Sequence, residues 1–238
     1  MNHTKRFYRS FSGTRGVSFN VRLDTTDLFI TSDSDLSEDA YRILAARRRE
    51  LEEHINSRRE FLYSLSPIET CCDSPSIILD MYRASAAAGV GPMAAVAGAV
   101  AEHTGRGLLE FTDEVIVENG GDIWLNLKAP AVLGIYEKSI YFRDRIRLKI
   151  NTENTPCSIF TSSSILGHSL SFGKADAATI VAGSGALADA VATGACNLVQ
   201  NENDLQKAVD YAMSVSGVRG CMIIFRDRFA ACGEIELC

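Results

Sequence analysis

The sequence lacks the features that mark membrane, exported or nucleic-acid-binding proteins. No apolar run reaches the roughly 18 residues that a bilayer-spanning helix needs. The amino terminus has basic residues but no apolar segment after them, so we predict no signal peptide and a cytoplasmic location. Lys and Arg number 24 against 30 Asp and Glu. The resulting net charge of −6 provides no basic field for nucleic acid.

The cysteines lack a recognisable pattern. There are seven, an odd number without regular spacing. Cys71 and Cys72 are adjacent, whereas Cys221, Cys232 and Cys238 do not have the C-x-x-C spacing of a zinc site. We therefore expect free thiols in a reducing compartment, without a disulfide framework or a structural metal. The pattern does not indicate what the cysteines do.

The composition is that of a folded globular chain. Apolar residues make up 46% and charged residues 23%, which argues against disorder. At 238 residues, the chain is near the upper end of a single domain. We predict one domain over residues 1–238, which could consist of two closely packed lobes.

Local patterns divide the chain into strands and helices. A capping-box-like start at Asp35 predicts a helix to about Leu62, and glycines predict helix ends at Gly89 and Gly105. Because strands come in succession and helices are grouped between them, we predict an α+β fold with largely antiparallel sheets and helices packed on them. The predicted strands are Arg6–Ser10, Val17–Leu23, Asp27–Thr31, Val115–Val117, Ile123–Leu125, Val132–Tyr136, Arg145–Ile150, Ser158–Thr161, Thr179–Val181, Cys221–Phe225 and Phe229–Leu237.

Small residues are concentrated in the predicted helices. Nine alanines lie between Ala84 and Ala101. Such a surface allows backbones, or a ligand, to approach very closely. Within it, Gly91 precedes Pro92 at the start of a predicted helix, where free backbone N–H groups suit a phosphate. A plain turn between two helices explains the same residues.

A second glycine pair lies between two predicted strands. Gly120 and Gly121 are flanked by Glu118, Asn119 and Asp122. Asn-Gly is a common hairpin turn. Paired glycines also let a ligand lie against the backbone, with the polar side chains reading its edges. Both interpretations remain open.

A run of hydroxyls and one imidazole follows. Thr161, Ser162 and Ser163 precede a Gly- and Ser-rich loop that contains His168. Such residues suit the binding of an oxyanion or phosphate, with His168 as a base or donor. A structural histidine is the alternative. A serine hydrolase using Ser162, Ser163 or Ser164 is disfavoured because the sequence has no G-x-S-x-G elbow.

Asp189 and Thr193 have the spacing of a shared ligand pair. On a helix, residues four apart lie on one face. A carboxylate and a hydroxyl are hard oxygen donors of the kind that Mg²⁺ prefers. A local cap or a hydrogen bond within the helix is the simpler alternative.

Taken together, these stretches resemble the ApbE superfamily of FAD:protein FMN transferases, and most closely its short cytoplasmic uncharacterised branch. Four blocks occur in the family's order, and the likeness extends from Arg6 to Leu237. The blocks are Val90–Gly98, Val117–Asp122, Gly167–Asp176 and Ala188–Ala190.

The resemblance implies an ApbE-like fold and a set of site residues. Asp189 and Thr193 would be Mg²⁺ ligands, joined by a backbone carbonyl near the Gly91 helix, and His168 would lie where the phosphoryl group is transferred. FAD would be the substrate or ligand, with Mg²⁺ neutralising its diphosphate. The residues expected to bind the nucleotide are Gly91, Glu118, Asn119, Gly120, Gly121, Asp122, Thr161, Ser162 and Ser163.

The leading hypothesis is therefore the binding of FAD, FMN or a similar phosphorylated ligand with Mg²⁺. FMN transfer, FAD pyrophosphate cleavage and binding alone all remain open. The alternative is a non-catalytic ApbE-fold protein that binds another metabolite or a protein partner. We expect neither a nucleic acid nor a membrane as partner. The sequence identifies neither the acceptor protein nor the oligomeric state, so a homo-oligomer stays open.

Overall fold

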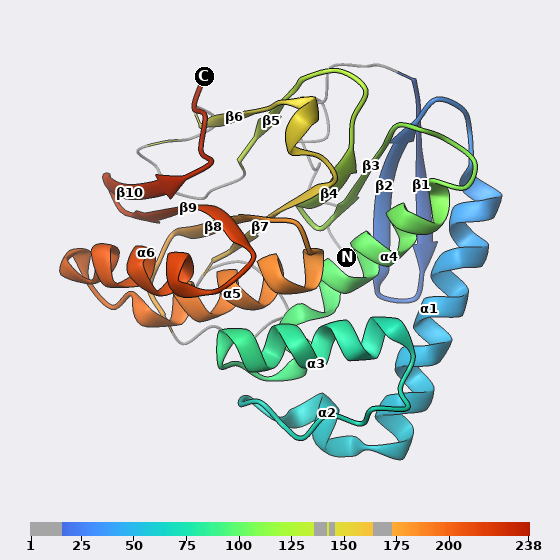
Figure 1. Cartoon of the computed structure of the whole chain (residues 1–238), viewed down its shortest axis with the longest axis horizontal. Helices are drawn as coiled ribbons and strands as arrows, with labels where there is room; N and C mark the ends of the chain where they lie inside the picture. Colours follow the sequence, from blue (N-terminus) through green and yellow to red (C-terminus); the bar gives the residue numbers. More distant parts are fainter. Residues whose placement is uncertain (1–15, 136–141, 143–145, 164–172) are drawn as a thin grey trace.

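A computed structural model describes residues 16–135, 142, 146–163 and 173–238 (Figure 1). Its centre is an eight-stranded sheet in the order β1-β2-β3-β4-β7-β8-β9-β10, with every neighbouring pair antiparallel. The strands are β1 Val17–Leu23, β2 Thr26–Ser32, β3 Val115–Asn119, β4 Asp122–Asn126, β7 Cys157–Ser162, β8 Ala177–Ala182, β9 Val218–Phe225 and β10 Arg228–Gly233.

Helices gather on one face of this sheet, below it and to its right in Figure 1. They enclose the larger apolar core, which contains Trp124 and Phe160. This arrangement confirms the predicted α+β fold with antiparallel sheets. The helices are α1 Ser37–Ser57, α2 Arg59–Tyr63, α3 Ser76–Ala88, α4 Val96–Leu108, α5 Gly185–Leu198 and α6 Leu205–Ser214, with short 3-10 turns η2 Pro92–Ala95, η3 Thr152–Asn154 and η4 Glu202–Asp204.

The opposite face of the sheet carries a second, smaller core. A two-stranded sheet, β5 Ala131–Gly134 and β6 Arg147–Ile150, covers it. Leu125, Ile159 and Val181 point to this side. Alternation along the central strands therefore supplies both cores, because successive side chains go to opposite faces.

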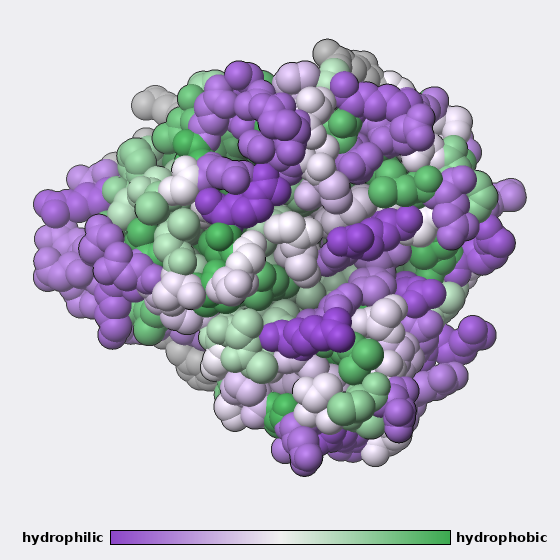
Figure 2. Space-filling view, viewed as in Figure 1, coloured by the Kyte–Doolittle hydropathy of each residue, from purple (hydrophilic) through white to green (hydrophobic). Residues whose placement is uncertain are grey.

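Hydrophilic residues surround a paler, more apolar band across the middle of the face seen in Figure 2. Within the described ranges, no individual helix is long and apolar enough to cross a bilayer. Helix α3 and the segment Pro92–Leu108 meet that test only as a pair, and they are bent by 107° relative to each other.

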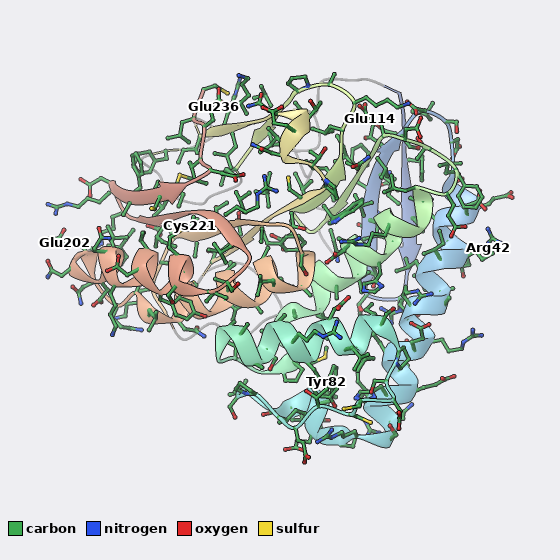
Figure 3. All side chains as sticks on the ribbon, viewed as in Figure 1. Arg42, Tyr82, Glu114, Glu202, Cys221 and Glu236 are labelled. Atoms are coloured by element: carbon green, nitrogen blue, oxygen red, sulfur yellow. The ribbon has the colours of Figure 1, made fainter. Side chains whose placement is uncertain are left out.

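Two predicted helix boundaries were wrong. The first long helix breaks at Arg58, where φ is −139°, so α1 and α2 are separate helices. Aromatic packing explains the break, because it turns Phe61 back against His54 and Tyr82, with Tyr82 lying between α2 and α3 (Figure 3). The helix expected to end at Gly105 runs on to Leu108.

Gly105 lies inside α4, where it packs against Trp124 of the sheet. A Cβ atom there would lie 2.2 Å from a ring carbon of the fully buried Trp124. The glycine thus serves the contact between helix and sheet and does not end the helix. By contrast, Gly89 ends α3 as predicted, in the left-handed conformation with φ of +68°.

A close crossing joins α4 to α5. A Cβ on Gly98 would lie 2.0 Å from the carbonyl oxygen of Gly185, and a Cβ on Gly185 would lie 2.4 Å from that of Gly98. The amino-terminal ends of the two helices meet near the centre of Figure 1 and run apart from there. The close approach predicted from the small residues is confirmed at this crossing.

The Gly105→Ala substitution tests the helix-to-sheet contact. Alanine favours a helix over glycine by about 1 kcal/mol, but overpacking a filled core costs about 1–3 kcal/mol. Because the indole has no room to move, we expect a net loss of stability in urea unfolding. Gly107→Ala in the same helix is the control, since the three atoms nearest to its Cβ would belong to the Ile43 side chain, at 3.0 to 3.4 Å. Equal losses in both variants would contradict the proposed contact.

Candidate functional site

The hairpin that joins β3 to β4 carries five of the predicted ligand-binding residues. Asn119 pairs with Asp122, so Gly120 and Gly121 form a two-residue turn. Their φ angles are +73° and +109°, a region that strongly favours glycine. Apart from the glycine and its two chain neighbours, none of the described residues has an atom within 4 Å of a Cβ built on either glycine. The glycines are required by the turn, and the space beside them is open.

The predicted ligand-binding side chains of β3, β4 and β7 divide between the two faces of the sheet. Trp124 and Phe160 lie in the core beneath the helices and fix the direction of the alternation. Asn119, Asp122 and Ser162 accordingly point to the helix side, and Glu118 and Thr161 point to the other side. A ligand that touched all five would have to lie across the strand ends at this hairpin.

Hydrogen bonds attach the hairpin to its neighbours. The Oδ1 atom of Asp122 accepts from the backbone N–H of Thr161 at 2.7 Å. The Nδ2 atom of Asn119 donates to the carbonyl oxygen of Ala97, in the first turn of α4, at 3.1 Å. On the far face, the Thr161 and Thr179 hydroxyls lie 2.9 Å apart. The hairpin is therefore fixed to both β7 and α4.

Asp189 reaches the same turn of α4 from α5. Its Oδ2 atom accepts from the backbone N–H of Gly98 at 2.9 Å. No side chain caps α4 from within its own sequence. A carboxylate suits this position because helix amino termini carry unpaired N–H groups and partial positive charge. Thr193, one turn further along α5, is 6% exposed.

Two of these carboxyl groups hold their protons unusually strongly. Burial raises the pKa of Asp189 to about 7, against the opposing effect of hydrogen bonds from the Gly98 and Ala97 backbone. The pKa of Asp122 is raised well above its usual value, first by burial and then by the charge of Asp189. The Thr161 N–H opposes this shift, and Glu118 adds to it. Two carboxyl groups that resist ionisation thus lie in an enclosed place.

No basic side chain of the described ranges forms an ion pair with Asp122 or Asp189. Nor do three or more His, Cys, Asp or Glu side chains in those ranges form a group that could hold a metal ion. A cation at Asp189 would therefore need hydroxyl, carbonyl or ligand oxygens as well. Carboxylate and hydroxyl oxygens fit Mg²⁺, which keeps several waters or phosphate oxygens in its coordination shell.

The remaining predicted residues differ in how they relate to this site. Gly91 is buried, and a Cβ there would lie 1.8 Å from the carbonyl oxygen of Ser64, so chain packing accounts for the glycine. Ser162 is half-buried at the end of β7, and Ser163 is 6% exposed. His168 and Ser164 lie outside the described residues.

The sequence-based prediction expected a backbone carbonyl near the Gly91 helix but did not identify which residues of α4 take part. Ala97 and Gly98 supply the carbonyl and amide groups that meet Asn119 and Asp189. Both residues lie in the alanine-rich segment, and a glycine at that point of a helix was the signal for a close approach. Thr179 was also missed, because its role depends on the pairing of β7 with β8.

Comparison with known proteins identifies relatives of this chain. The chain is 34% identical over 217 residues to the UPF0280 protein MJ1526 of Methanocaldococcus jannaschii, covering 89% of this chain and 88% of that protein. It is 36% identical over 205 residues to the UPF0280 protein MK0206 of Methanopyrus kandleri, covering 84% and 83%.

Solved structures share the fold at low identity. The flavin transferase ApbE from Vibrio cholerae matches with a TM-score of 0.60 at 12% identity, over 92% of this chain and 96% of that one. The apo form of the Pseudomonas stutzeri flavinyl transferase ApbE matches with a TM-score of 0.56 at 11% identity, over 92% and 94%. The model of the family described as AbpE bacteria matches residues 9–219. The chain belongs to this family.

Proposed function

We propose that this protein binds a flavin nucleotide, FAD or FMN, together with Mg²⁺, at the junction of the β3–β4 hairpin with α4 and α5. Asp189 and Thr193 would hold the cation. The hairpin residues Glu118 to Asp122 would line the nucleotide site. The fold shared with flavin transferases supports the flavin part of the proposal, and the relatives of higher identity carry no stated activity.

The observation that carries the proposal is the enclosed acidity of Asp122 and Asp189, which no basic side chain among the described residues compensates. Burying carboxylates without a cation is costly. Burial raises the pKa of both groups, and the charge of Asp189 raises the pKa of Asp122 further. A divalent cation would remove the repulsion and offset the burial. One oxygen of Asp189 accepts from the Gly98 amide. That bond orients the carboxylate, and its other oxygen would bind the cation.

The residues around the pair suit a diphosphate. Gly120 and Gly121 leave room for a ligand to lie on the turn. The hydroxyl groups of Thr161, Ser162 and Ser163 would donate hydrogen bonds to phosphate oxygens, and Gly91 would present the start of the η2 turn. Bound Mg²⁺ would neutralise the diphosphate charge. His168 would accept the proton from the attacking hydroxyl group.

Incubation with FAD and Mg²⁺ separates the possible activities. Release of AMP with FMN attached to a hydroxyl of an added acceptor protein indicates transfer. Release of AMP with free FMN indicates pyrophosphate cleavage. Saturable binding without either product indicates a flavin-binding protein. If neither binding nor turnover occurs with FAD or FMN, the proposal is wrong.

The Asp189→Asn variant tests the cation ligand. The amide keeps an oxygen for the Gly98 N–H but loses the charge, so the cap on α4 is largely retained. We expect Mg²⁺-dependent FAD binding to weaken at least about tenfold, which corresponds to roughly 1.4 kcal/mol. Calorimetry with and without Mg²⁺ measures the change. Asp210→Asn, at an exposed position of α6, is the control and should bind like the parent. Unchanged Mg²⁺ dependence in Asp189→Asn would remove this residue from the site.

The affinity for Mg²⁺ should depend on pH. Because the pKa of Asp189 is raised to about 7, a proton occupies the carboxyl group below that pH and competes with the cation. We expect the apparent Kd to rise by up to about tenfold per pH unit as the pH falls below about 7, and to level off above about 8. Titrations of Mg²⁺ across this range measure it. Asp189→Asn should remove this pH dependence, whereas a flat profile in the parent would contradict the assignment.

A further inference from the structure

Glu102 is a buried carboxylate outside the predicted site. It lies on α4 and is 3% exposed. Its Oε2 atom accepts from the backbone N–H of Gly185 at 2.7 Å and from the Ser184 hydroxyl at 3.0 Å. Its Oε1 atom accepts from Nε of Arg106, an exposed side chain, at 2.8 Å. The buried oxygen is therefore directed at the start of α5.

This contact mirrors the one made by Asp189. Glu102 of α4 binds the first amide of α5, and Asp189 of α5 binds an amide in the first turn of α4. Between the two bonds, Gly98 and Gly185 touch backbone to backbone. Each helix thus supplies a carboxylate to the amino terminus of the other. Two charge-assisted hydrogen bonds at one crossing fix how α5 is rotated about its axis and where it lies along α4.

Because Gly185 and Asp189 lie in the same helix, the restraint on Gly185 also acts on Asp189. From Gly185 to Asp189 is about one helical turn, roughly 6 Å along the axis, and Thr193 follows one turn later. A helix is stiff over this length, so holding its first amide holds both side chains. Loss of the Glu102 contact would let the start of α5 shift, and the Asp189 carboxylate would move with it.

We propose that Glu102 is a positioning residue, which places Asp189 and Thr193 for the cation by anchoring the start of α5. The effect of Glu102 on cation binding rests on the proposed function. The anchoring of α5 by Glu102 concerns the two helices alone and is tested without any ligand. Glu102 touches neither flavin nor metal in this proposal.

Three variants separate the contacts of Glu102. Glu102→Gln can keep its amide oxygen on Gly185 and Ser184, so it should restore what Glu102→Ala loses. Arg106→Gln removes the exposed ion pair and leaves the buried oxygen in place. Glu102→Asp, which withdraws the carboxylate by one methylene group, replaces Glu102→Ala if the latter does not fold.

Amide hydrogen exchange at Gly98 is the ligand-free measurement. Glu102 does not touch this N–H, which donates to Asp189. We expect exchange at Gly98 to be at least about tenfold faster in Glu102→Ala than in the parent. Exchange in Glu102→Gln and Arg106→Gln should stay within about threefold of the parent. Parent-like exchange in Glu102→Ala would overturn the anchoring.

Titration with Mg²⁺ in the presence of FAD is the second measurement. In Glu102→Ala, we expect the apparent Kd for Mg²⁺ to rise at least about tenfold, while the amount of FAD bound at saturating Mg²⁺ stays unchanged. A general loss of folded protein would instead lower that amount. A parent-like Kd together with faster exchange at Gly98 would overturn the positioning role. If the parent protein itself shows no Mg²⁺ dependence, the proposed function and the effect of Glu102 on cation binding are both wrong. Amide exchange at Gly98 then still tests whether Glu102 anchors the start of α5.

Discussion

The backbone contact between Gly98 and Gly185 is the constraint on which the candidate site depends. Any side chain at either position would lie within 2.4 Å of the partner's carbonyl oxygen, so the helices could not meet at this separation. Only at this separation does the Asp189 carboxylate reach the first turn of α4. The β3–β4 hairpin joins the same turn through Asn119 and Ala97. Three segments that are distant in sequence thus meet at one helix start.

The meeting point combines two opposing electrostatic effects. The amino terminus of α4 provides unpaired N–H groups and partial positive charge, which favour an ionised Asp189. Burial favours the protonated form of Asp189 and has the larger effect, and the charge of Asp189 in turn favours the protonated form of Asp122. The pKa of Asp189 is therefore raised to about 7, and that of Asp122 is raised well above its usual value.

Much of the fold was predictable from the sequence because its signals are local. Alternating strands such as Val17–Leu23, and the glycine pair at Gly120 and Gly121, have the period and backbone preferences of β-structure. The two misplaced helix boundaries had a common cause. The helix boundaries near Gly105 and Arg58 were predicted from helix propensity. In the structure, contacts with Trp124 and with the aromatic cluster around Phe61 determine the conformation at these two positions. Contacts between distant segments overrode local preference.

By itself, the sequence determined the residue types available to the site and the family to which the chain belongs. The spacing of Asp189 and Thr193 placed them on one face of a helix because helical geometry is local. What the carboxylate faces was decided only by tertiary structure. The Gly98 amide, the Ala97 carbonyl and Asp122 come from other segments, and only packing of α4, α5 and the sheet brings them together. The raised pKa of Asp189 has the same origin, because burial is a property of the folded chain.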